Sequence, residues 1–147
     1  MVFDTSAVLA ILEREPERRH FLEAIEAADS TRMSVASFVE TSMVIESRCG
    51  VEGLRDLDRF ISRAGIELVP VDAEQGQLAC SAFSRFGKGR HRAGLNYGDC
   101  FSYAAAMALG ESPCSAKATI SSTLTCRSST YGTGNPSCGK ESTGFVR

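Results

Sequence analysis

Apolar residues in the first 110 positions follow two patterns that alternate along the chain. Short continuous apolar runs predict strands, and longer runs with apolar residues three and four positions apart predict helices. The predicted strands cover 1–4, 32–35 and 66–71. The predicted helices cover 5–13, 15–28, 36–49, 54–65, 73–86 and 96–109. Strands that feed helices in this order predict an α/β fold with a parallel sheet covered on both faces.

Local signals mark the ends of several predicted helices. Thr5 or Ser6 is suited to cap the N-terminus of the first helix, and Pro16 suits the first turn of the second. Gly50 is placed to end the helix that precedes it. Residues 87–94 read as a loop before the final helix. These signals divide the helical part of the sequence into separate segments.

The pattern stops after Gly110. Residues 113–147 are about half Ser, Thr and Gly and contain one acidic residue, Glu141. Such a segment cannot bury enough surface to offset the entropy of ordering it. We therefore predict a folded domain over 1–112 and a disordered tail over 113–147. A domain of this class usually returns one more strand to its sheet, so the last strand is expected to be missing or altered.

The composition favours one intracellular domain without a membrane segment. A chain of 147 residues suits a single core. A net charge of -2 and a pI near 5.7 exclude a global basic field, so a nucleic acid would have to meet a local patch. No apolar run reaches the roughly 20 residues that span a bilayer, and no signal segment opens the chain. Six cysteines without a CxxC pair favour the reducing cytoplasm.

Three acidic residues lie where a predicted strand or loop passes into a helix. Asp4 follows the first apolar run, Glu40 lies just after the second strand, and Asp99 opens the final helix. Parallel α/β proteins build their sites at such junctions. Acids gathered at one sheet edge repel one another unless a hard divalent cation binds between them. The sequence therefore predicts a metal-dependent phosphodiesterase that uses these three acids.

Each acid also has a structural interpretation. Asp4 is a favoured helix N-cap, Asp99 suits the dipole of a first helical turn, and a salt bridge would satisfy Glu40 at the border of an apolar face. The densest positive cluster precedes the last helix and consists of Lys88, Arg90, His91 and Arg92. This cluster is either a contact for phosphate groups or a solvated loop.

The segments VFDTSA at 2–7, SFVET at 37–41 and GKGRHRAGLNYGDCFSYA at 87–104 carry a family likeness. In order and spacing they resemble the PIN-domain ribonucleases, and more narrowly the VapC toxins of bacterial toxin–antitoxin pairs of a mycobacterial type. The resemblance runs from Met1 to about Gly110. It implies a three-layer sandwich in which helices flank a parallel central sheet. It also implies a magnesium-dependent endoribonuclease that is the toxin of a type II toxin–antitoxin system.

The resemblance also assigns roles to single residues. Asp4 and Asp99 would hold Mg²⁺, for which Mn²⁺ can substitute, and Glu40 would be a further ligand or orient the attacking water. The residues expected in the metal's outer shell or against the RNA substrate are Thr5, Asn96, Ser102, Arg90 and Arg92. The implied partners are RNA, a cognate VapB-type antitoxin and a second copy in a homodimer, in the cytoplasm and without a membrane.

The end of the chain departs from this family. The family normally adds a fourth acid in a KGxDF-like segment after the last helix, and Lys117 stands near that place. Residues 113–121 can be encoded by codons whose shifted frame reads Leu-Leu-Cys-Lys-Gly-Asn-Asp-Phe, which is a strand followed by the missing motif. The hypothesis is that the tail is a frameshifted product of a family gene.

Three functions remain open from the sequence. The chain is an active endoribonuclease toxin, or a catalytically impaired descendant that binds antitoxin or RNA without efficient cleavage. The third is a non-enzymatic α/β binding domain in which the acids are caps and ion pairs. A stabilising response to Mg²⁺ or Mn²⁺ distinguishes the metal-binding functions from the third.

Overall fold

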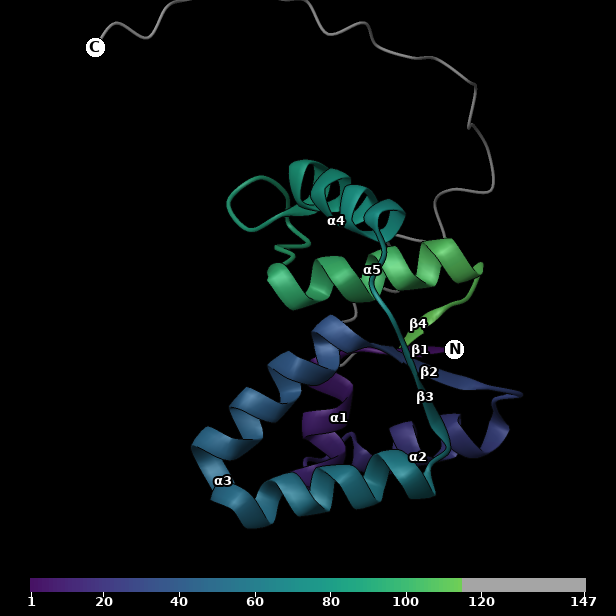
Figure 1. Cartoon of the computed structure of the whole chain (residues 1–147), viewed down its shortest axis with the longest axis vertical. Helices are drawn as coiled ribbons and strands as arrows, with labels where there is room; N and C mark the ends of the chain where they lie inside the picture. The colour runs from purple at the N-terminus through teal and green to yellow at the C-terminus, as the bar shows by residue number, and fades with distance from the viewer. Residues whose placement is uncertain (115–147) are drawn as a thin grey trace, which may run out of the picture.

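The structure is a computed structural model that describes residues 1–114 (Figure 1). Its four strands are β1 (Val2–Phe3), β2 (Thr31–Ser34), β3 (Ile66–Val69) and β4 (Pro113–Cys114). Its helices are α1 (Thr5–Leu12), α2 (Arg18–Ala27), α3 (Val35–Arg63), α4 (Ala73–Phe86) and α5 (Tyr97–Leu109). Every predicted strand and helix has a counterpart, so the predicted alternation is confirmed.

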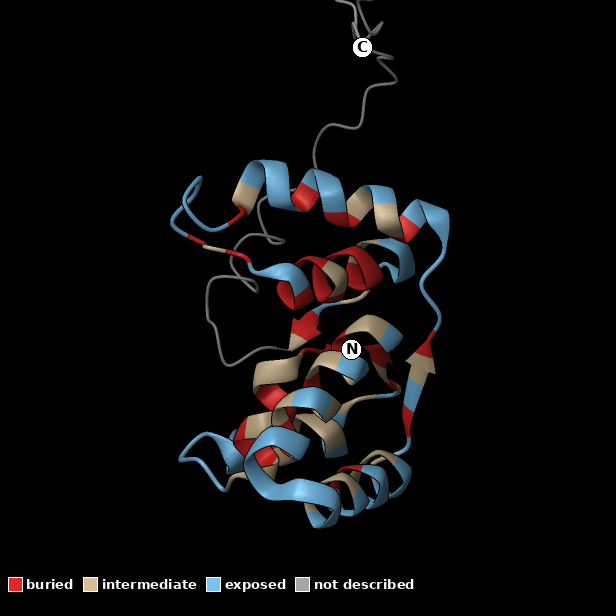
Figure 2. Cartoon of the chain, turned by 60° about the vertical axis from the view of Figure 1, so that its left-hand side comes forward, coloured by how far each residue is buried: buried red, intermediate tan, exposed pale blue. Residues whose placement is uncertain are grey.

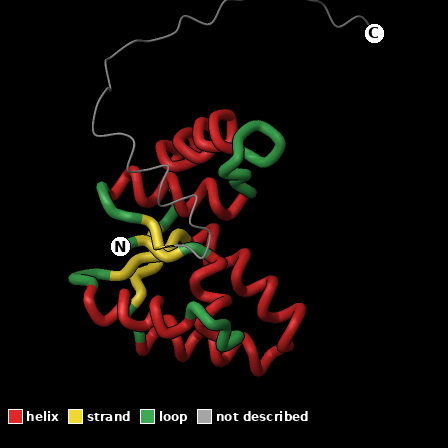
Figure 3. The backbone as a smooth tube through the Cα atoms, turned by 180° about the vertical axis from the view of Figure 1, so that it is seen from behind, coloured by secondary structure: helices red, strands yellow, loops and turns green. Residues whose placement is uncertain are grey.

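The strands form one parallel sheet in the order β3-β2-β1-β4. Val2 of β1 pairs with Arg32 on one side and with Pro113 on the other. Helices α4 and α5 cover one face of the sheet, and α1, α2 and α3 cover the other (Figure 1). Figure 3 shows the strands gathered between these two groups of helices. The predicted three-layer α/β architecture is therefore confirmed.

The two residues of β1 face opposite layers, because successive side chains of a strand alternate. Val2 packs with Ala105 and Ala106 of α5. Phe3 belongs to the core under α1, α2 and the end of α3, together with Met33 of β2. Figure 2 shows α5 buried along most of its length, whereas the outer side of α4 is exposed. The strand that leads to Asp4 is thus fixed from both faces.

The last described strand decides between two expectations for the end of the sheet. The final strand was expected to be missing or altered, and Pro113–Cys114 forms β4 and pairs with β1. The backbone N–H of Val2 donates to the carbonyl of Ser112 at 2.9 Å, and that of Asp4 donates to Cys114 at 3.1 Å. Within the described residues, the two positions 113 and 114 join the sheet, and two residues carry too little pattern to mark a strand. The rest of the predicted tail lies outside the described residues.

The boundaries of three elements differ from those predicted. Helix α2 begins at Arg18, so Pro16 precedes it. Strand β3 ends at Val69, because Pro70 follows and has no N–H to continue the ladder. Helix α3 runs to Arg63, but Gly50 inside it has φ 62° and ψ −159°, which are not helical values. Gly50 therefore divides α3 into two arms, as its predicted role as a helix end implies.

None of the helices within residues 1–114 combines the length and continuous apolar character that a bilayer-spanning segment needs.

Candidate functional site

The three predicted acids lie at the carboxyl end of the sheet. In the sheet, β2 lies next to β1 and β3 lies next to β2, whereas β4 lies on the other side of β1. The order of the strands therefore reverses at β1, and open parallel sheets bind ligands at such a reversal, beyond the carboxyl ends of the strands. Asp4 directly follows β1 and occupies this position.

Asp4 is the N-cap of α1. The sequence made Thr5, Ser6 and Asp4 candidates for this position. Its Oδ1 accepts the backbone N–H of Ala7 at 2.9 Å and the hydroxyl of Ser6 at 2.8 Å. Only 1% of Asp4 is exposed. A buried carboxylate is costly unless it is bonded or paired, so these donors fix its orientation at the end of β1.

Asp99 is held by a reciprocal cap at the start of α5. The side-chain oxygen of Asn96 accepts the backbone N–H of Asp99 at 2.8 Å, and Oδ2 of Asp99 accepts the N–H of Asn96 at 2.9 Å. Asp99 is 4% exposed. The predicted structural interpretation of Asp99, a first-turn acid, is therefore correct for its local geometry, and its role as a metal ligand stays a prediction.

Glu40 connects the helices that carry these two aspartates. Its Oε2 accepts the hydroxyl of Thr5 at 2.6 Å, which ties α3 to the first turn of α1. Its carboxylate also lies against Gly98, so closely that a Cβ built at position 98 would overlap it. Thr5 adjoins Asp4 and Gly98 adjoins Asp99. Glu40 therefore contacts a sequence neighbour of each buried aspartate, and the convergence of the three carboxylates on one cation stays a prediction.

Ser102 is placed one turn beyond Asp99 but points into the protein. Its hydroxyl and that of Ser37 are 2.8 Å apart, and both residues are fully buried. The hydroxyl of Thr5 also lies 3.3 Å from the carbonyl of Ser37. These bonds join α5, α3 and α1 directly beneath the acids. Ser102 thus supports the site by holding the helices together.

Two thiols near the aspartates have raised pKa values. Burial raises the pKa of Cys100 to about 11, helped by the charge of the adjacent Asp99. Burial likewise raises the pKa of Cys114 to about 11, helped by the charge of Asp4. Both thiols are therefore protonated at neutral pH. The four cysteines of the described residues are free, as their spacing predicted.

A family model described as the PIN domain matches residues 1–113. The chain belongs to the PIN-domain family. It is 56% identical over 112 residues to a Ribonuclease VapC of Mycolicibacterium smegmatis, covering 76% of this chain and 86% of that protein. It is 51% identical over 111 residues to Ribonuclease VapC30 of Mycobacterium tuberculosis, covering 76% of this chain and 85% of that protein.

Two solved structures share the architecture of this PIN domain. The crystal structure of VapC20 from Mycobacterium tuberculosis, described as a toxin that cleaves the sarcin–ricin loop, has a TM-score of 0.67 at 16% identity and covers 84% of this chain and 95% of its own. VapBC2 of Rickettsia felis, bound to a fragment of its promoter DNA, has a TM-score of 0.57 at 16% identity, with 77% and 86% covered. At this identity the likeness shows the fold alone.

The donors of the PIN domain site suit a hard divalent cation. Carboxylate oxygens are the ligands that Mg²⁺ and Mn²⁺ prefer, and Asp4 and Asp99 present them from fixed positions. Among residues 1–114, no group of three or more His, Cys, Asp or Glu side chains is arranged to hold one metal ion. The arrangement fits a metal held by one or two carboxylates with water completing its shell, as is usual for Mg²⁺.

The basic loop before α5 is exposed. Lys88, Arg90 and Arg92 all lie on the surface, and the guanidinium of Arg90 stands over the ring of Phe83, 5.2 Å from its centroid. His91 instead accepts the backbone N–H of Ala93 at 3.0 Å through Nδ1. The loop therefore offers cations to solvent, whereas the bonded His91 is not placed as a metal ligand.

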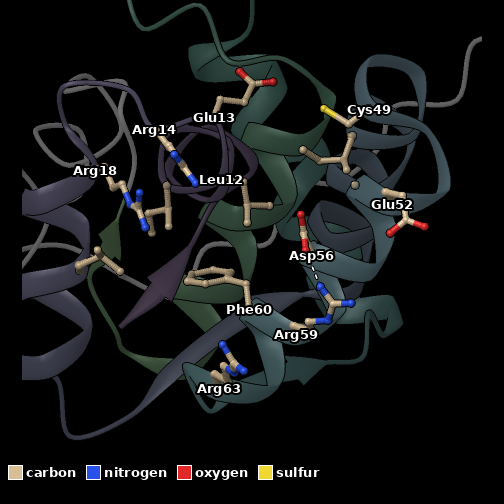
Figure 4. Close-up of a pocket in the computed structure, with 14 residues that line it drawn as sticks. Leu12, Glu13, Arg14, Arg18, Cys49, Glu52, Asp56, Arg59, Phe60 and Arg63 are labelled. Carbon is tan, nitrogen blue, oxygen red and sulfur yellow. Dashed lines mark hydrogen bonds and ion pairs between the residues drawn. The ribbon is translucent and has the colours of Figure 1, made fainter.

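A separate cavity of about 750 Å³ lies between α1, α2 and the second arm of α3 (Figure 4). Charged side chains of both signs surround it, and Asp56 pairs with Arg59 at 2.8 Å. It adjoins the C-terminal end of α1, whereas Asp4 caps the opposite end. None of the predicted site residues lines this cavity.

Sequence reasoning missed three residues that shape the PIN domain site. Ser6 bonds Asp4, Ser37 bonds Ser102, and Gly98 leaves room for the Glu40 carboxylate. The signals were available only in part. A serine two positions after an N-cap aspartate is a recognisable local pattern, whereas the pairing of Ser37 with Ser102 depends on how α3 and α5 pack.

Proposed function

We propose that this chain is a metal-dependent endoribonuclease, the toxin of a type II toxin–antitoxin pair. The observation that supports it most is that Glu40 contacts Thr5 and lies against Gly98, the sequence neighbours of Asp4 and Asp99, where Asp4 follows β1 at the strand reversal. The family membership and the ribonuclease names of relatives at 51 to 56% identity point to the same chemistry.

Mg²⁺ is the proposed cofactor, with Mn²⁺ as a substitute, and Asp4 and Asp99 are its proposed ligands. When bound, such an ion lowers the pKa of its water and offsets the charge that develops on a phosphodiester. Glu40, fixed by the hydroxyl of Thr5, is placed to orient that water. Asn96 keeps Asp99 in position through the reciprocal cap. No side-chain nucleophile is required.

RNA is the proposed substrate, and the exposed cations Arg90 and Arg92 are its proposed phosphate contacts. Contacts of this kind orient a nucleic acid without reading its sequence. The ribonuclease names of the relatives at 51 to 56% identity support RNA as the substrate class.

A VapB-type antitoxin is the proposed partner, with a segment that covers the acidic site. Three exposed apolar residues lie one turn apart on the first arm of α3, beside Glu40, and offer such a segment a surface: Val35, Val39 and Met43. The neighbouring structure from Rickettsia felis is a VapBC complex. A homodimer and a location in the cytoplasm stay predictions.

The experiment measures metal binding and cleavage on the same protein. Thermal unfolding with Mg²⁺ or Mn²⁺ should give a higher melting temperature than with EDTA, because a ligand that binds only the folded state stabilises it. Cleavage of a structured RNA should require the metal. Asp99→Asn should lose both responses, whereas Glu46→Gln, an exposed acid on α3, should keep them. A parent without any metal response would favour the non-enzymatic binding domain.

A second candidate is an impaired PIN domain that binds RNA or antitoxin but cleaves poorly. The family model ends its match at residue 113, and the fourth acid that the family resemblance implies falls near Lys117, outside the described residues. Metal-induced stabilisation without RNA cleavage would favour this candidate.

A further inference from the structure

An apolar pocket of about 440 Å³ lies between α4 and α5, outside the acidic site. Phe83 of α4 forms one wall, and Tyr97 and Phe101 of α5 form another. Small residues of the two helices, Ala79 and Cys80 among them, also line it. A volume of this size lies within the range of pockets that bind small planar ligands.

The aromatic walls are exposed to an unusual degree for side chains of this size. Tyr97 is 70% exposed and Phe83 is 41% exposed. The Tyr97 and Phe101 rings lie 4.8 Å apart at 60°, which supports Tyr97 from one side and leaves its outer surface open. Exposed apolar surface that gathers at a pocket marks a binding site more often than isolated exposed residues do.

One cation stands at a wall of this pocket. Arg90 lies over the Phe83 ring at 5.2 Å, so one of the aromatic walls already carries a guanidinium. Lys88 and Arg92 are exposed in the same loop as Arg90. Aromatic rings interleaved with arginines are the recurring surface for single-stranded nucleic acid, because bases stack on the rings and phosphates meet the cations.

The pocket and the acids share one turn of α5. Tyr97 is the first residue of α5, Gly98 adjoins Glu40, and Asp99 follows. Cys100, the next residue, lines the pocket. The N-terminal turn of α5 therefore carries both a wall of the pocket and Asp99.

We infer that the pocket between α4 and α5 binds an unpaired nucleobase of the RNA substrate, stacked between Tyr97 and Phe83, with Arg90 on its phosphate. This inference rests on the proposed ribonuclease function and names a subsite for it. The alternative ligand of this pocket is a second copy of the chain. A two-fold contact centred on this pocket would bring Arg90, which stands over Phe83, near its own copy, and like charges in such a contact oppose association.

The test uses the full chain with Asp99→Asn, so that RNA is bound and not cleaved. Fluorescence anisotropy with a labelled twelve-nucleotide single-stranded RNA measures affinity. Tyr97→Ala should weaken binding about tenfold, in line with the loss of one stacked base, whereas Tyr97→Phe keeps the ring and should restore it. Val51→Ala, an exposed apolar residue on the second arm of α3, is the matched control and should leave affinity unchanged.

A second probe replaces the nucleotides of that RNA with abasic residues, one at a time. At one position, the abasic substitution should weaken RNA binding to the parent about as much as Tyr97→Ala does. The abasic RNA and the Tyr97→Ala variant together should lower the affinity little more than either change alone. Arg90→Gln should lower the slope of log affinity against log salt by about one, because one phosphate contact is lost. Arg19→Gln, an exposed arginine of α2, is its control.

Several outcomes would overturn the inference. One is that Tyr97→Ala and the parent bind the RNA with equal affinity. Another is that every abasic substitution weakens RNA binding to Tyr97→Ala as much as it weakens binding to the parent. Sedimentation in which Tyr97→Ala dissociates a dimer while RNA affinity stays constant would identify the pocket as a self-association surface. In the chain with Asp99 intact, an unchanged KM for RNA cleavage in Tyr97→Ala would contradict this subsite but not the ribonuclease function. A parent chain that neither binds nor cleaves RNA would contradict the proposed function itself.

Discussion

The hydroxyl of Thr5 donates a 2.6 Å hydrogen bond to Oε2 of Glu40, although the two residues are 35 positions apart. The bond joins the first turn of α1 to the first arm of α3. It fixes one oxygen of a half-buried carboxylate against the residue that follows Asp4. The placement of Glu40 therefore depends on a residue that follows a different strand.

Replacing Thr5 tests this dependence. Thr5→Val keeps the shape of the side chain but removes the donor, and a hydrogen bond to a charged group contributes about 1.5–3 kcal/mol. We expect a lower melting temperature and a lower kcat for RNA cleavage. Thr5→Ser retains the hydroxyl and should recover most of both. Equal behaviour of the valine and serine variants would show that the bond does not position Glu40.

Gly98 should not tolerate a side chain. In Gly98→Ala the new Cβ overlaps the Glu40 carboxylate, so Glu40 must move and metal-induced stabilisation should weaken. Gly76→Ala is the control for stability, because nothing lies within 4 Å of a Cβ there, and alanine in a helix should raise stability by about 0.5–1 kcal/mol.

The same clash predicts a rescue. Glu40→Asp is shorter by one methylene, so the Gly98→Ala/Glu40→Asp double variant should relieve the overlap and recover stability relative to Gly98→Ala alone. Calorimetric titration with Mg²⁺ and thermal unfolding measure the two effects. A double variant no more stable than the sum of its single changes would mean that the overlap is relieved elsewhere.

The buried pair Ser37 and Ser102 should be strongly coupled. Removing one hydroxyl leaves the other buried without that partner, at a cost of about 1–3 kcal/mol. The double alanine variant removes both polar groups and should cost less than the two single variants added together. Urea unfolding of the four proteins gives the coupling, and strict additivity would contradict it.

The buried thiols predict a loss of stability at alkaline pH. The folded pKa of Cys100 is about 11, above the roughly 8.5 of a thiol in an unfolded chain. Between these values the unfolded state loses the proton first, so the contribution present below about pH 8.5 declines as pH rises toward 11. Cys100→Ala should flatten the fall of the melting temperature in this range, and Cys49→Ala, an exposed thiol, should leave it unchanged.

The frameshift hypothesis has a direct test in the gene. The codons for residues 113–121 should contain a second frame that reads Leu-Leu-Cys-Lys-Gly-Asn-Asp-Phe. Codon choices incompatible with that reading end the hypothesis. If the frame is present, a variant protein that carries it should melt at a higher temperature, because it restores a longer final strand and a further acid.

The sequence predicted the fold well because its signals are local. Apolar runs and helical spacing placed the strands and helices, and Gly50 marked a real break in α3. The acids were found because each follows a strand or opens a helix. The sequence left open whether the last strand is missing or altered, because the two residues of β4 carry too little pattern to distinguish a strand from a tail.

The features of the site that the sequence did not predict depend on contacts between distant segments. Met43 of α3 is apolar but 67% exposed, which its residue type alone does not predict. The bond of Ser37 to Ser102 and the contact of Gly98 with Glu40 arise only when α3 and α5 are packed together.

The kink at Gly50 allows substitutions far from Glu40 to change the orientation of Glu40 on α3. The first arm presents Glu40 to the site, and Leu57 on the second arm fills the core under the sheet. Because the backbone bends at a single residue with positive φ, the direction of each arm is set by its own neighbours. Substitutions that straighten this hinge would force both arms onto one axis and turn the carboxylate away from its neighbours, without touching any residue near it.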